Sequence, residues 1–232
     1  MNNLKENNKV YLSGEIVTDA VFSHEVYGES FYEMCVSVNR LSGQADILPI
    51  TVSERLINKN ELKIGSKICA LGQFRSYNKL VDNKSKLMLT VFIREILEDN
   101  DNFKNPNSIM LCGFVCKPPV YRTTPFNREI ADLLIAVNRS YNKSDYIPCI
   151  AWGRNARFVK NFAVGEKIAI TGRIQSREYQ KKFSDTDIKI LTAYEVSVSR
   201  LIALDKDEEF DLDSEFNTSL NANYSLLNYE NL

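Results

Sequence analysis

Short segments in which apolar and polar residues alternate recur along this chain of 232 residues, and such alternation predicts β-strands. Residues 10–17 and 109–116 alternate around a central glycine, Gly14 or Gly113, and glycine inside a strand often marks a bulge or a bend. Further strands are predicted at residues 34–38, 47–52, 68–77 and 87–96, and again at residues 133–137, 146–152, 168–177 and 190–198. The stretches at residues 54–62 and 154–162 suit one or two helical turns.

The second half of the chain repeats the first. Asn8-Lys-Val-Tyr-Leu-Ser-Gly14 recurs as Asn107-Ser-Ile-Met-Leu-Cys-Gly113, and Asp46 recurs as Asp145, in both cases 99 positions later. Gly72 and Ser76 recur 100 positions later, and the segment that starts at Thr90 recurs 102 positions later, at Thr192. An ordered series at a nearly constant offset indicates tandem domains.

Each repeat contains five predicted strands with a helix between the third and the fourth, which is the order of the OB-fold barrel. We therefore predict an all-β fold with short helices. One OB-fold domain is expected at residues 1–102, a second at residues 103–204, and an acidic tail at residues 205–232. The acidity of the tail and its lack of periodicity predict disorder.

The charges divide the chain in the same places. Lys+Arg 29 and Asp+Glu 30 nearly cancel, but residues 1–102 carry a charge of −2, residues 103–204 carry +8 and residues 205–232 carry −7. A basic block beside an acidic tail is more informative than the total. Because a basic block can be either a solvated surface or a binding site, its residues must be placed before it is interpreted.

Several kinds of protein and site find no support. No apolar run reaches the roughly 18 residues of a membrane span, and the N-terminus lacks the apolar core of a secretion signal, so a cytoplasmic protein is expected. Five cysteines are expected to be reduced core thiols, and a zinc site at Cys112 and Cys116 is disfavoured because both lie on a predicted strand. With one histidine and no Gly-rich phosphate loop, we predict no catalytic residue, no metal site, no cofactor and no enzyme activity.

Five stretches of the second repeat together carry a family resemblance. They are Asn107-x-Ile-x-Leu-x-Gly113, Arg122-x-Thr-Pro125, Leu134-Ile-Ala-Val-Asn138, Tyr146-Ile-Pro-Cys-Ile-Ala-Trp-Gly-Arg154 and Gly165-x-x-Ile-x-Ile-x-Gly-Arg-Ile-Gln-Ser-Arg177. Through them the chain resembles a bacterial or phage-type single-stranded DNA-binding protein with tandem OB-fold domains. The resemblance implies sequence-nonspecific binding and protection of single-stranded DNA during replication, recombination and repair, in association with the nucleoid. It also implies that bases stack on Tyr141, Tyr146, Trp152 and Tyr179.

The residues themselves support a binding surface on the second repeat. Alternate residues of a strand share a face, so Arg173, Gln175, Arg177 and Tyr179 point one way, which is unsuited to a core. Proteins that hold single strands combine stacking aromatics with a basic groove. Each aromatic could instead pack in the core and each arginine could be a solvated charge, but the cluster favours binding. The predicted phosphate partners are Arg122, Arg128, Arg139, Arg154, Arg157, Arg173 and Arg177.

The first repeat departs from this pattern. Ile47 and Ser53 stand where the second repeat has Tyr146 and Trp152. We assign Phe31 to a hairpin or the core. The first repeat keeps a smaller set of candidate DNA-contacting side chains, Arg40, Arg55, Arg75 and Tyr77. We therefore expect the first domain to bind DNA more weakly or to serve in pairing.

Assembly and partners follow from the resemblance. Members of this family commonly join four OB domains, so a homodimer of the tandem chain is expected, with single-stranded DNA as its ligand and no membrane. The acidic tail could recruit replication or repair proteins, although it lacks the Pro-Phe ending of the family. The alternative function is a primosome-type or other OB-fold protein-interaction module with little affinity for single-stranded DNA.

Overall fold

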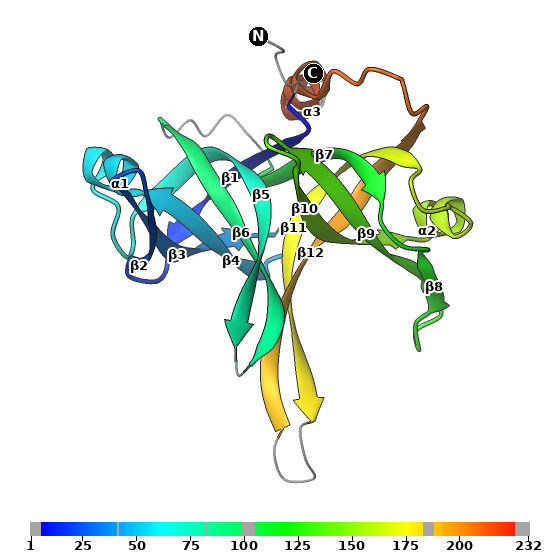
Figure 1. Cartoon of the computed structure of the whole chain (residues 1–232), viewed down its shortest axis with the longest axis horizontal. Coiled ribbons are helices and arrows are strands. Elements are labelled where there is room, and N and C mark those ends of the chain that lie inside the picture. Colours follow the sequence, from blue (N-terminus) through cyan, green and yellow to red (C-terminus); the bar gives the residue numbers. More distant parts are fainter. Residues whose placement is uncertain (1–5, 41, 82, 99–104, 183–187, 226–232) are drawn as a thin grey trace, which may run out of the picture.

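The computed structural model describes residues 6–40, 42–81, 83–98, 105–182 and 188–225, whose strands form two barrels (Figure 1). The first barrel contains β1 (Asn8–Ile16), β3 (Glu29–Asn39), β4 (Ala45–Ser53), β5 (Lys67–Val81) and β6 (Lys84–Leu97). The second contains β7 (Asn107–Val115), β9 (Glu129–Arg139), β10 (Lys143–Trp152), β11 (Lys167–Lys182) and β12 (Ile188–Leu204). The helices α1 (Glu54–Asn60) and α2 (Arg154–Val159) and the short strands β2 (Val21–Val26) and β8 (Val120–Thr123) complete the repeats.

Each barrel closes in the same order. β1 pairs with β3 and β5, β4 pairs with β3 and, in parallel, with β6, and β6 pairs with β5. The strands β7, β9, β10, β12 and β11 repeat this order. With a helix between the third and the fourth barrel strand, both halves are OB folds, and the predicted fold class is confirmed.

Two glycines allow the fourth and fifth barrel strands to bend. The register between β5 and β6 shifts at Gly72, and that between β11 and β12 shifts at Gly172. A Cβ on Gly72 would lie 2.4 Å from the Phe92 carbonyl oxygen, and one on Gly172 would lie 2.2 Å from that of Ser197. No side chain fits there, which explains why the two repeats share these glycines.

The structure revises one part of the sequence repeat. In the parallel pairs, Val91 lies beside Ile50 and Val196 lies beside Cys149, so Val91 and Val196 occupy equivalent places. Ser197 therefore matches Phe92, and the match of Thr90 with Thr192 is wrong. The offset between the repeats therefore rises from 100 at Ser76 and Ser176 to 105 at Val91 and Val196, so the insertion in the second hairpin is larger than the sequence match suggested.

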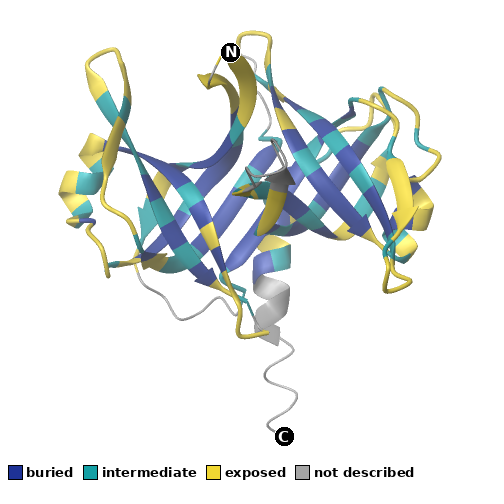
Figure 2. Ribbon diagram, turned by 90° about the horizontal axis from the view of Figure 1, so that it is seen from below, coloured by how far each residue is buried: buried dark blue, intermediate teal, exposed yellow. Residues whose placement is uncertain are grey.

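One sheet joins the two barrels. β1 and β7 pair antiparallel, with Val10 opposite Ile109, so the barrels share a continuous order through β5, β1, β7 and β11. Both residues are fully buried. Figure 2 shows buried residues along the strands of both barrels and exposed residues in the outer hairpins and helices. Since the joint is made by backbone hydrogen bonds and apolar packing, the two domains form one unit.

The C-terminal segment differs from its predicted disorder. Residues 212–225 form a helix, α3 (Leu212–Ser225), which contacts β1 and β7 at the end of the molecule opposite the long hairpins (Figure 1). Its Leu212, Phe216 and Leu220 are buried against Tyr11 and Met110. These apolar residues recur every fourth position and so share one helix face, which supplies the burial that a disordered tail lacks. Residues 226–232 of the predicted tail lie outside the described residues.

The cysteines are all free. Cys69 and Cys149 are buried, whereas Cys35, Cys112 and Cys116 are only half-buried, so the assignment of all five to the core is wrong. Within the described ranges, no group of three or more His, Cys, Asp or Glu side chains could hold a metal ion. None of the described helices is long and apolar enough to cross a membrane.

Candidate nucleic-acid interface

Two carboxylates tie each barrel to the long hairpin of the other. Asp46 Oδ1 accepts a hydrogen bond from the backbone N–H of Ser176 at 2.8 Å, and Asp145 Oδ1 accepts one from that of Ser76 at 2.7 Å. Ser76 and Ser176 lie on β5 and β11, near the point where each hairpin leaves its barrel. We call the parts of the hairpins beyond these serines the first arm and the second arm.

Four of the arginines predicted to contact DNA, two from each repeat, surround these carboxylates. Arg40 donates to Asp46 from Nε at 2.7 Å, and Arg173 Nη1 lies 3.2 Å from the same carboxylate. Arg139 and Arg75 lie 3.3 and 3.6 Å from Asp145. Each cluster contains one arginine from each barrel, so these arginines stabilise the junction between the barrels as well as supplying positive charge.

The two aspartates of these clusters differ in the direction in which their pKa values are shifted. Burial works to raise the pKa of Asp46, but hydrogen bonds from Arg40 and Ser176 hold this pKa below its ordinary value. Burial prevails at Asp145 and raises its pKa, despite the Ser76 hydrogen bond and the nearby charges of Arg139 and Arg75. Asp145 Oδ2 and Arg139 Nε form no hydrogen bond within the described part of the chain, which explains the weaker stabilisation of this carboxylate.

A groove of about 620 Å³ opens beside Asp145, and we call it the interdomain groove. Residues of both barrels line it, and its cationic and aromatic members are Arg75, Arg94, Arg139, Lys143, Phe92 and Tyr141. Tyr141 lies in the β9–β10 turn with φ 61° and is 94% exposed. A non-glycine residue in the left-handed region is uncommon, and here the turn presents the ring to solvent. This groove brings Tyr141, Arg139 and Arg75 together as an aromatic and cationic surface.

The other predicted aromatics of the second domain also lie on the surface. Tyr146 is 46% exposed, Trp152 38% and Tyr179 37%, so none is sealed in the core. Tyr179 lies on the second arm, with the Arg177 guanidinium 5.9 Å from the centre of its ring. Ile174, on the opposite face of β11, is fully buried, as the alternation predicted.

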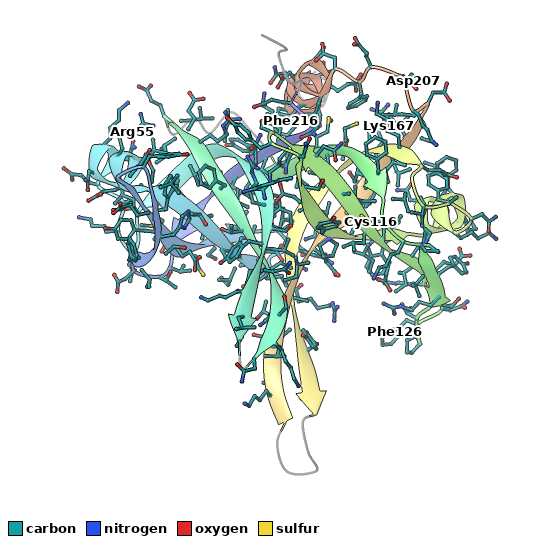
Figure 3. The ribbon with its side chains drawn as sticks, viewed as in Figure 1. Arg55, Cys116, Phe126, Lys167, Asp207 and Phe216 are labelled. Atoms are coloured by element: carbon teal, nitrogen blue, oxygen red, sulfur yellow. The ribbon has the colours of Figure 1, made fainter. Side chains whose placement is uncertain are left out.

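Several predicted arginines lie outside the interdomain groove. Arg55 extends from α1 at the outer end of the first barrel (Figure 3) and lies 3.9 Å from Glu29. Arg122 is paired with Asp132 at 3.0 Å, and Arg157 is paired with Glu129. Arg128 and Arg154 are exposed near the β8–β9 hairpin and on α2. Because an ion pair weakens the attraction of an arginine for phosphate, Arg122 and Arg157 contribute less to a cationic track than unpaired arginines would.

The first domain has a groove that the sequence interpretation missed. It measures about 660 Å³ and lies between the β2–β3 hairpin and the first arm; we call it the first-domain groove. Phe22, His24, Phe92 and Tyr77 line it, and Phe31 packs against His24 and Phe92. The alternation of residues along β3 could have revealed this groove. Met34, Val36 and Val38 fill the core, and Phe31, an odd number of positions away from them, therefore belongs to the outer face.

The two joined barrels make this chain a tandem OB-fold protein. Its residues 106–201, which span the second barrel, match the model of the Single-strand binding protein family. This match covers less than half of the chain, and the first barrel lies outside it.

Individual relatives agree with the family match. The chain is 36% identical over 83 residues to "Single-stranded DNA-binding protein 3" of Streptococcus agalactiae, which covers 33% of this chain and 60% of that protein. It is 34% identical over 83 residues to "Single-stranded DNA-binding protein A" of Bacillus subtilis, with coverage of 33% and 48%. The chain thus spans about half the length of these curated relatives.

A solved structure shares the architecture over most of the chain. The wild-type single-stranded DNA binding protein from Thermus aquaticus superimposes with a TM-score of 0.65 at 18% identity, covering 88% of this chain and 95% of the other. At that identity the similarity shows a common fold of two barrels.

Proposed function

We propose that this chain binds single-stranded DNA without sequence preference and has no catalytic role. The observation that carries the proposal is the meeting of Tyr141, Arg139 and Arg75 in a groove built by both barrels. A flat exposed ring can stack on any base, and guanidinium groups neutralise phosphates, so the combination suits a strand of any sequence. The names of the relatives support the same ligand.

The proposed surface extends from this groove over the second domain. Tyr146, Trp152 and Tyr179 supply further exposed rings, and Arg177 lies beside Tyr179. Each stacked base contributes about 1–3 kcal/mol, so a few such contacts give useful affinity. Protection of single strands in replication, recombination and repair, in the cytoplasm and on the nucleoid, is the role that this binding would serve.

Fluorescence anisotropy of a labelled oligo-dT of about 30 nucleotides tests the proposal, since OB folds cover about 4–16 nucleotides each. Trp152→Ala should weaken binding about ten-fold, whereas Phe158→Ala should leave it unchanged. Phe158 is a suitable control because it is an exposed aromatic of the same domain that lies on α2, away from the strands that carry Tyr146, Trp152 and Tyr179. Failure of the wild-type chain to bind oligo-dT at low salt would overturn the proposal and favour a protein-interaction module.

We also propose that the chain forms a homodimer, as its family resemblance implies. α3 already covers Tyr11 and Met110 on the shared sheet, so a second copy must contact a different surface or displace this helix. Light scattering should give twice the chain mass of 26.6 kDa. The single-chain mass would contradict the dimer and leave DNA binding unaffected. We propose, as the family resemblance implies, that the acidic C-terminal segment recruits replication or repair proteins.

A further inference from the structure

The first barrel lacks the tryptophan of the second but carries an aromatic ring directly across the strand ladder. Trp152 on β10 lies opposite Ile130 on β9, and the equivalent pair in the first barrel is Ser53 on β4 opposite Phe31 on β3. Directly opposed residues of an antiparallel pair point to the same face, with Cβ atoms about 5 Å apart. The two barrels therefore place a ring at the same site on the same face, from neighbouring strands.

Phe31 belongs to a cluster that has no counterpart in the second barrel. The His24 ring stacks on it with ring centres 5.0 Å apart and planes 10° apart, and Phe92 lies 5.5 Å away. Arg122, Ile130 and Ser197 match His24, Phe31 and Phe92 in the second barrel, and none of these is aromatic. Where the second barrel has one exposed tryptophan, the first barrel therefore has three rings, those of His24, Phe31 and Phe92.

Hydrogen bonds hold one wall of the first-domain groove, the wall formed by the first arm, in place. Tyr77 on the first arm donates a hydrogen bond to Glu33 Oε1 at 2.9 Å, and Ser23 on β2 donates to the same oxygen at 2.9 Å. Burial, together with the hydrogen bond to Glu33, raises the pKa of Tyr77 to about 12, so the phenol stays protonated and keeps donating. The Tyr77 ring is therefore positioned across the groove from the Phe31 cluster.

The first-domain groove continues into the interdomain groove. Arg75, Phe92 and Arg139 line both. Arg75 is held in place by Asp145, and Lys79 follows it on the same face of the first arm. A strand that leaves Tyr141 can thus keep its phosphates on these cations while its next bases enter the first domain.

We propose that the first domain is a second base-stacking site, in which Phe31, with His24 and Phe92 beside it, takes the place of Trp152. The inference rests on the proposed function, since it assigns the same ligand, single-stranded DNA, to a further site. The first domain then binds in continuity with the second, and a strand long enough to reach both grooves gains the contacts of each.

The test uses the full-length chain with labelled oligo-dT of about 10 and about 30 nucleotides, lengths that one and two OB folds can hold. Phe31→Leu keeps an apolar side chain and removes the ring, and His24→Ala changes an exposed residue. Both should weaken binding of the longer strand, Phe31→Leu by about ten-fold, and leave the shorter strand's affinity for the second domain unchanged. Equal thermal unfolding of variants and wild type confirms that the fold is intact.

NMR gives a second measurement, because the chain contains a single histidine. A base stacked at Phe31 should shift the His24 ring resonances when the longer strand is added. If these resonances stay in place and both variants bind the longer strand like the wild type, while Trp152→Ala weakens it, the second site is refuted and the proposed function stands. If the wild type binds neither strand, the proposed function itself fails.

Discussion

Asp46 on β4 accepts a hydrogen bond from the backbone N–H of Ser176 on β11, and this contact links the first barrel to the second arm. The equivalent contact of the other barrel joins Asp145 on β10 to the backbone N–H of Ser76 on β5. Each aspartate also holds an arginine from each barrel, so both aspartates fix the barrels relative to each other. Asp145 in addition positions Arg75 and Arg139 of the interdomain groove, so stability and the proposed DNA affinity are coupled at Asp145.

The two aspartates should respond to pH in opposite ways. The pKa of Asp46 is lowered in the folded chain, so its contribution to the free energy of unfolding is present at neutral pH and is lost as pH falls through that pKa, below 3.8. The pKa of Asp145 is raised, so its contribution is present below pH 3.8 and is lost as pH rises through the raised value.

At pH 7, Asp46→Asn should therefore lower the free energy of unfolding by about 2 kcal/mol, and Asp145→Asn by less. Urea unfolding at pH 7 and near pH 3 measures both differences. The Asp46→Asn deficit should shrink at the lower pH. Equal losses for the two variants at pH 7 would contradict the asymmetry.

Arg139 and Arg75 should contribute to the salt dependence of binding. If Arg139 contacts a phosphate, Arg139→Gln should reduce the slope of log K against log salt concentration by about 0.7, the value expected for one contact on a single strand. Arg55→Gln is the matched control, because Arg55 lies on α1 and lines neither groove. Oligo-dT titrations over a salt series give the slopes. A slope that falls equally for both variants would place the phosphate path elsewhere.

α3 should contribute to the stability of the folded chain. Phe216 is fully buried against the shared sheet, and the Lys9 ammonium lies 5.6 Å from its ring centre and 2.6 Å from Asp213. Truncation of a buried phenylalanine costs about 3–5 kcal/mol where the surroundings cannot collapse, and a terminal helix can detach instead. Phe216→Ala should therefore make the C-terminal segment sensitive to limited proteolysis, while Asn217→Ala on the exposed side should not. If the C-terminal segment of the wild type is cleaved as readily as that of Phe216→Ala, α3 does not pack stably on the shared sheet.

The strands could be predicted from the sequence because their alternation survives in both repeats, and Gly72 and Gly172 stand at the bends. The pairing of β1 with β7 could not, since an alternating pattern specifies which face of a strand is buried and not which strand lies at its edge. α3 was missed because its apolar stripe, Leu212, Phe216 and Leu220, is narrow and surrounded by acidic and polar residues.

The candidate site shows a similar division. The exposed rings of the second domain followed from alternation and from the family resemblance. The Phe31 cluster did not, because comparing the repeats position by position finds only Ser53 where Trp152 should be. The ring sits on the neighbouring strand, and only the register between β3 and β4 shows that the two positions share one site.

Binding of unpaired bases on the second domain can be observed directly through the fluorescence of Trp152, the only tryptophan of the chain. Its emission should be quenched when oligo-dT is added at low salt and should recover as salt is raised, while duplex DNA of the same length should have little effect. Emission that stays constant with the single strand, or that changes equally with duplex DNA, would contradict binding of unpaired bases on this surface.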